Sequence, residues 1–83
     1  MEKKYIGTGE FKRLVATGGI DEVVARKIDN KHFVLFGVSQ NKDHVFMIRK
    51  ARTGEPKTWV RLDYLENFVV KTKAKSFNVI GLN

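Results

Sequence analysis

The sequence predicts a single basic α+β domain over residues 1–83, with two helices on an antiparallel sheet of four or five strands. Two segments carry apolar residues at helical spacing, which predicts the helices. Two β-rich segments are joined by a short polar loop, which predicts the centre of a sheet. The expected order of elements along the chain is therefore α-β-β-β-(β)-α-β.

The first helix is expected over residues 9–17. Phe11, Leu14 and Val15 recur at the i, i+3, i+4 spacing of an apolar stripe, and Thr8 is a suitable N-cap. The Gly-Gly pair at 18–19 follows the stripe, and glycine supplies the left-handed conformation in which many helices end.

Three strands are expected next, over residues 20–28, 32–39 and 44–52. The first is rich in β-branched residues, and the other two have the sequences HFVLFGVS and HVFMIRKAR. A four-residue polar loop separates these two and predicts an antiparallel hairpin. With Ser39 placed opposite His44, both faces of this hairpin are apolar near its centre.

One face of the hairpin is expected to pack under the helices, and the other needs a different explanation. Phe33, Leu35, Phe46 and Ile48 share one face and form a patch that a monomer does not usually expose. Either the strand at 20–28 and the N-terminal segment cover this patch, or it is an interface with a second copy or with a partner protein.

The second helix is expected over residues 62–72, because four apolar residues from Leu62 to Val69 recur at 0, +3, +6 and +7. A loop at 53–56 and a short extended segment at 57–60 precede it. A last strand is expected over 76–82. Because it follows a helix, it should lie parallel to a neighbouring strand or at an edge of the sheet.

The sequence favours a protein without catalytic residues, metal or cofactor. It has no cysteine, and His32 and His44 fall at opposite ends of the predicted hairpin, too far apart to share a metal or a catalytic triad. Asp63 and Glu66 are more typical of a solvated helix face than of an acid–base pair. The Gly-Thr-Gly at 7–9 opens a helix and could meet a phosphate, but it lacks the rest of any nucleotide-binding motif. A small enzyme or metal protein is the most distant alternative.

The charge distribution carries the main functional information. The chain has 16 Lys+Arg and 9 Asp+Glu, and residues 49–83 contain eight of the basic residues but only three acidic ones. Basic side chains neutralise phosphates and release counterions, which gives affinity for nucleic acid. The alternative is that the charge serves solubility. The candidate phosphate-binding residues are Arg49, Lys50, Arg52, Lys57, Arg61, Lys71, Lys73 and Lys75.

Two aromatic residues lie close to these basic residues. Trp59 and Tyr64 are candidates for stacking on unpaired bases. For Trp59, the sequence favours a place in the core beneath the second helix over stacking.

No apolar segment approaches the roughly 20 residues that a membrane-spanning helix requires. The basic residues near the N-terminus are not followed by the apolar stretch of a signal peptide. The expected location is therefore cytoplasmic, with no membrane partner.

Three stretches together resemble a known group of proteins: FKRLVATGGI at 11–20, KTWVRLDYLENF at 57–68 and SFNV at 76–79. They are similar to small proteins encoded on plasmids and integrated mobile elements, some of which are described as partition-associated accessory proteins. The resemblance spans nearly the whole chain and consists mostly of core positions. It implies plasmid maintenance or other DNA-associated work, and it assigns no site residue.

The leading hypothesis is a non-enzymatic, DNA-associated accessory protein of a plasmid or mobile element that binds nucleic acid mainly through phosphate contacts. A homodimer would double its basic surface. The alternative is a protein-interaction module, an inhibitor or adaptor, that binds a partner protein through its basic surface and an apolar sheet face.

Overall fold

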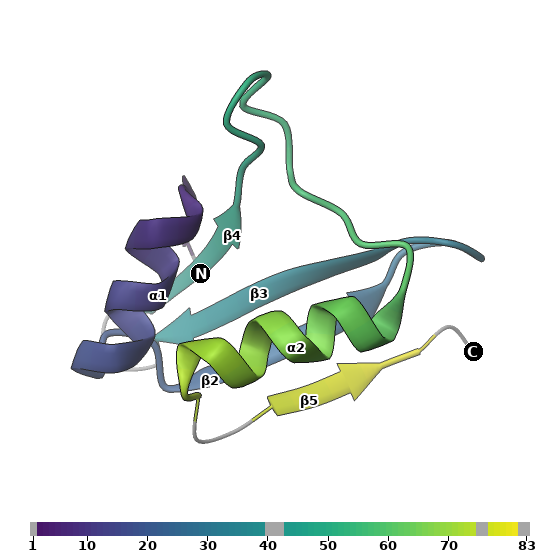
Figure 1. The fold of residues 1–83 in the computed structure, drawn as a ribbon. Coiled ribbons are helices and arrows are strands. Elements are labelled where there is room, and N and C mark those ends of the chain that lie inside the picture. The colour runs from purple at the N-terminus through teal and green to yellow at the C-terminus, as the bar shows by residue number, and fades with distance from the viewer. Residues whose placement is uncertain (1, 40–42, 75–76, 82–83) are drawn as a thin grey trace.

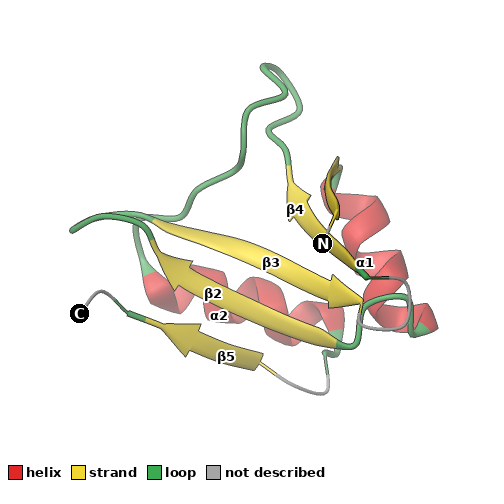
Figure 2. Ribbon diagram, turned by 180° about the vertical axis from the view of Figure 1, so that it is seen from behind, coloured by secondary structure: helices red, strands yellow, loops and turns green. Residues whose placement is uncertain are grey.

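The computed structural model describes residues 2–39, 43–74 and 77–81. Within them, both helices lie on the same face of one sheet, and the other face has no helix over it (Figures 1 and 2). The elements are β1 (Glu2–Ile6), α1 (Thr8–Thr17), β2 (Glu22–Lys27), β3 (Phe33–Ser39), β4 (His44–Ile48), α2 (Leu62–Thr72) and β5 (Phe77–Ile80).

The sheet has the strand order β1-β4-β3-β2-β5 and is mixed. Its three central strands are antiparallel, whereas β1 lies parallel to β4 and β5 lies parallel to β2. Two parallel strands cannot be joined by a tight turn and need a longer connection. Here α1 follows β1 and α2 precedes β5, so each of these connections includes a helix. The α+β class with two helices is thus confirmed, whereas the prediction of an antiparallel sheet is wrong at both edges, where β1 and β5 pair in parallel. The last strand, β5, is both parallel to its neighbour and at an edge.

The helices form close to where the sequence predicts them. The second covers the predicted range 62–72, whereas α1 begins at Thr8, so that Gly7 and not Thr8 is the N-cap residue. Gly18 ends α1 with φ of 84°, a conformation that costs glycine little because it has no Cβ. The amides of Gly18 and Gly19 then bond to carbonyl oxygens in the last turn.

The register of the central hairpin is the predicted one where the two strands pair. Ser39 lies opposite His44, and the pairing continues to Phe36 opposite Met47. Beyond this point the prediction of a longer strand to residue 52 is wrong, because the two strands diverge and the returning chain takes the place of β4. Phe33 pairs with Trp59 there, and an isolated bridge joins Arg49 to Pro56.

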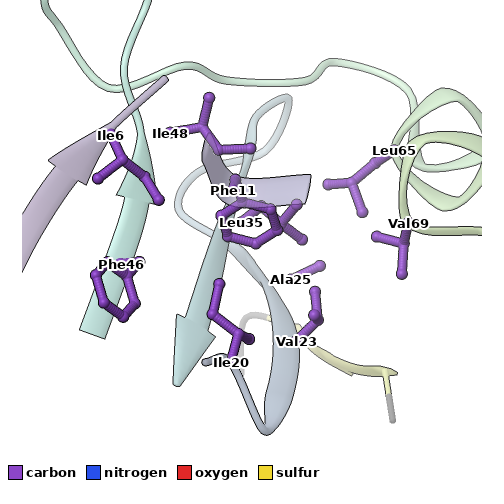
Figure 3. Close-up of a cluster of buried hydrophobic side chains, with 10 residues drawn as sticks. All are labelled: Ile6, Phe11, Ile20, Val23, Ala25, Leu35, Phe46, Ile48, Leu65 and Val69. Atoms are coloured by element: carbon purple, nitrogen blue, oxygen red, sulfur yellow. The ribbon is translucent and has the colours of Figure 1, made fainter. Parts of the chain in front are cut away.

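The core fills the space between the helices and the sheet (Figure 3). Phe11 of α1 and Leu65 of α2 are completely buried against side chains of the strands. The buried hydrophobic cluster comprises Ile6, Phe11, Ile20, Val23, Ala25, Leu35, Phe46, Ile48, Leu65 and Val69.

The expectation of an interface at Phe33, Leu35, Phe46 and Ile48 is wrong. Leu35, Ile48 and Phe46 are only 1%, 2% and 7% exposed, because their face is the one that the helices cover. Phe33 is partly buried and packs against the same cluster. The surplus apolar face of the hairpin is the opposite one, which includes Phe36 and Val45.

Candidate nucleic-acid interface

Aromatic contacts hold the segment between β4 and α2 against the helix layer. Trp59 exchanges two backbone hydrogen bonds with Phe33, at 2.8 and 2.9 Å. Its ring lies 5.7 Å from the ring of Phe68 in α2, which in turn lies 6.3 Å from the ring of Phe11 in α1. Trp59 therefore belongs to the rim of the core, the alternative that the sequence left open beside base stacking.

Three of the predicted basic residues gather around one hollow. Arg49, Lys50 and Lys57 line it together with Gly7 and Thr8 at the start of α1. The hollow has a volume of about 470 Å³, and its other two lining residues, Ala51 and Thr58, carry no charge either. Within the described part of the chain no carboxylate lines this hollow, so none of its lining residues forms an ion pair with Arg49, Lys50 or Lys57.

Contacts with the fold restrain two of these cations. The Arg49 guanidinium donates from Nη1 to the carbonyl oxygen of Tyr5 at 3.2 Å. The Lys57 ammonium group lies 5.4 Å from the centre of the Trp59 ring, a cation–π contact. Each side chain loses part of its freedom before any ligand arrives, which lowers the entropy cost of binding an anion.

The start of α1 adds positive potential to the same hollow. The Phe11 amide makes the first helical hydrogen bond, to the carbonyl oxygen of Gly7. The amides that precede Phe11 in α1 have no acceptor within the helix, and the helix dipole is positive at this end. The field of the helix thus reinforces that of Arg49, Lys50 and Lys57.

Arg61 is placed differently from these three residues. Its guanidinium forms a two-point ion pair with Asp63, with distances of 3.1 and 2.6 Å. This pairing holds the pKa of the Asp63 carboxyl below its ordinary 3.8. Arg61 also stacks on the ring of Tyr64 at 4.3 Å. Tyr64 is 58% exposed, but one side of its ring is occupied by this guanidinium.

The remaining predicted residues lie apart from the hollow. Arg52 is exposed in the turn that follows β4. Lys71 and Lys73 are exposed at the far end of α2, where Lys73 lines a second hollow with Gly18 and Asp21. Because the 11-residue helix α2 is about 16 Å long, the structure separates Lys71 and Lys73 at its far end from the predicted residues around the hollow. Lys75 lies outside the described residues.

Sequence reasoning missed Lys12, which lies on the helix layer. Its ammonium group is 5.4 Å from the centre of the Phe68 ring, and that ring is the neighbour of Trp59. Lys12 and Lys57 therefore lie over adjacent rings. Lys12 directly follows the core residue Phe11 in the sequence, which places it next to the core on the first helix. It belongs to neither basic cluster along the chain, so clustering alone does not identify it.

The two histidines lie at opposite ends of the β3–β4 hairpin, as expected. The Nδ1–H group of His32 donates to the Asp29 carboxylate at 2.9 Å, and the same carboxylate accepts hydrogen bonds from the amides of Lys31 and His32. His44 meets the ring of Phe46 edge-on at 5.9 Å. Among the described residues, no group of three or more His, Cys, Asp or Glu is placed to hold a metal ion.

In the part of the chain that the structure describes, neither helix is long and apolar enough to cross a membrane. Comparison with protein-family models, with curated proteins and with solved structures found no match in any of the three.

Proposed function

We propose that this domain is a non-enzymatic, DNA-associated protein that binds the phosphate backbone of DNA at the hollow formed by Arg49, Lys50 and Lys57. Lys12, and the exposed lysines at the end of α2, extend the basic surface beyond the hollow. Phosphate contacts of this kind give affinity that depends on salt and only weakly on sequence.

One observation carries the proposal: three cations converge beside a helix N-terminus with no carboxylate among them. Elsewhere on the described surface a cation is paired with a carboxylate, because Arg61 forms an ion pair with Asp63. A solubility function requires charge but does not require it to be concentrated and unpaired at one hollow.

The resemblance to partition-associated accessory proteins of plasmids and mobile elements agrees with this activity. It suggests a cytoplasmic protein that acts on the DNA of the element encoding it.

The test is an anisotropy titration of labelled duplex and single-stranded DNA over a range of salt concentrations. The variant carries Arg49→Gln, Lys50→Gln and Lys57→Gln. Each phosphate contact contributes about 0.9 to the slope of log affinity against log salt on duplex DNA, so three lost contacts should reduce it by about 2.7. The difference between about 50 and about 200 mM salt should then shrink roughly 40-fold.

A charge-matched control separates the hollow from net charge. Arg26→Gln, Lys31→Gln and Lys4→Gln remove the same charge from exposed positions that do not line the hollow. We expect this variant to lose much less of the slope. Equal losses in both triple variants would refute the hollow as the site. If the wild-type protein bound neither form of DNA at low salt, the proposed function itself would be wrong.

A further inference from the structure

The face of the sheet opposite the helices is apolar and has no helix or strand over it among the described residues (Figure 2). Strand pairing places Tyr5, Met47, Phe36 and Val24 in one row across β1, β4, β3 and β2. A groove of about 590 Å³ along this face is lined by Tyr5, Met47 and Phe36 of that row. Tyr5 is 44% exposed, and Phe36 and Val24 are partly exposed, whereas Met47 is only 7% exposed. The segment between β4 and α2 lines the same groove through Lys50, Glu55, Pro56 and Thr58. Part of this apolar row is therefore exposed to water, which favours an interaction surface.

The next row of the same face has charged ends of opposite sign. The registers place Lys3 beside Val45, Val45 beside Val38, and Val38 beside Glu22. Glu22 accepts a hydrogen bond from the Asn78 side chain at 2.9 Å, which holds its carboxylate on this face. The row is therefore a cation, two valines and an anion, in that order across the sheet.

We propose that a second copy of this chain covers the open face, related by a two-fold axis that runs parallel to the strands between β4 and β3. Such an axis exchanges the two ends of each row. Lys3 of one copy then lies over Glu22 of the other, twice in the dimer, and valine meets valine between them. The row is self-complementary, as an isologous interface requires.

Other charges also border this face, because Lys50 and Glu55 line its groove. Arg26 pairs with Val34, beyond the point where β3 and β4 pair, so its row does not continue across to β1. The cations of β1, Lys3 and Lys4, lie in other rows. Two packed sheets cross at about 30°. The ends of a row lie about 7 Å from the two-fold axis, so this crossing displaces them by about 3.5 Å. A lysine side chain spans that shift.

The size of the face sets the strength of the contact. The four strands that overlap in this dimer, spaced about 4.8 Å apart and about 17 Å long, present roughly 330 Å² in projection. A standard interface buries about 800 Å² on each partner. The dimer should therefore be weak and must be sought at high protein concentration.

The test is sedimentation equilibrium of the full chain from about 10 μM to about 1 mM, a range suited to an interface of this size. The wild-type mass should rise from 9.5 kDa towards twice that value. Lys3→Glu and Glu22→Lys should each weaken dimerisation about tenfold or more, because each replaces two attractive pairs by two repulsive ones. The double variant should return to the wild-type affinity.

The controls use neighbouring charges that face elsewhere. Lys4→Glu lies next to Lys3 on β1, in register with the core residue Phe46, and Glu10→Lys lies on α1. Both should dimerise like the wild type, and circular dichroism should show every variant folded. A wild-type chain that stays monomeric, or a double variant that stays as weak as the single ones, overturns the proposal. Lys50 and Thr58 line both the basic hollow and the groove on this face. The test of the dimer is nevertheless separate from the proposed function, because it uses Lys3 and Glu22, which do not line the hollow, and contains no DNA.

Discussion

Gly37 lies in the middle of β3 on the face that the helices cover, and a methyl group there has no room. A Cβ built at this position would lie 2.6 Å from Cδ1 of Ile20 and 2.9 Å from Cε2 of Phe11. Both distances are well below the normal 3.5–4.0 Å contact between carbon atoms. Ile20 could turn its terminal methyl away, but the fully buried Phe11 ring is confined by the ring of Phe68.

Gly37→Ala should therefore destabilise the domain. Overpacking a core typically costs about 1–3 kcal/mol, and replacing glycine inside a strand recovers about 0.5–1 kcal/mol of chain entropy. The expected net loss is about 1–2 kcal/mol. For a domain of this size, 1 kcal/mol corresponds to roughly 4–8 °C in Tm, so the midpoint should fall by about 5–15 °C.

The assay is urea unfolding followed by the fluorescence of Trp59, the only tryptophan. Ile20→Val removes the methyl group that the new Cβ would strike, so the two substitutions should be non-additive. The double variant should be about 1 kcal/mol more stable than the sum of the single effects predicts. Gly9→Ala is the matched control, because a Cβ at Gly9 meets nothing within 4 Å and alanine favours the helix. It should stabilise the protein.

The reasoning fails on either of two results. One is a Gly37→Ala variant as stable as the wild type. The other is a double variant whose free energy of unfolding equals the sum of the two single effects, since additivity would mean that the Cβ and the Ile20 methyl group do not compete for space.

Two further predictions concern the helix end and the response to acid. Gly18→Ala should lower stability by about 1–2 kcal/mol in thermal unfolding, because φ of 84° places a Cβ against the following carbonyl oxygen; a stability gain would contradict this. Hydrogen bonds from Lys31 and the His32 side chain lower the pKa of Asp29, and Arg61 lowers that of Asp63, so NMR titration should place both carboxyls below 3.8. Their stabilising effect is present above pH 3.8 and lost as the pH falls through the lowered pKa, so an Asp29→Asn, Asp63→Asn double variant should lose less stability over that range.

Much of the fold could be predicted because local periodicity and packing agree. The stripe from Leu62 to Val69 has a single apolar side, and that side enters the core through Leu65 and Val69. The strand β1 could not be predicted in this way. Its sequence EKKYI contains three charged residues, and it forms at the sheet edge through parallel pairing with β4, more than 35 residues away along the chain. Charged side chains are common on edge strands and leave no apolar alternation to detect.

The choice between the two hairpin faces could not be made from the sequence either. Phe46 and Met47 are both apolar and adjacent, so alternation shows that each face has an apolar centre but not which one meets the helices. Gly37 was the discriminating residue: it leaves space beneath Ile20 and Phe11 on its own face, as its contacts show. A glycine opposite Phe46 marks the side on which another element approaches closely.

For the candidate site, the sequence identified the basic residues but not their grouping. The Arg61–Asp63 pair is separated by two positions and could have been anticipated. The meeting of Arg49 and Lys57 with the start of α1 could not, because it depends on the divergence of β3 and β4 and on the return of the chain to Phe33. The hollow thus forms where the backbone pairing between β3 and β4 ends.

The two proposed surfaces constrain each other. A dimer through the open face would place both helix layers on its outside, because helices and open face lie on opposite sides of the sheet. Two sheets packed about 10 Å apart, each with a layer of helices about 10 Å thick, separate the outer helix surfaces by roughly 30–40 Å. In such a dimer the two helix surfaces would face away from each other, so one straight duplex could not contact both at once. Dimerisation would then not raise the affinity for one DNA segment. It would instead allow one dimer to bind two DNA segments and bring them together.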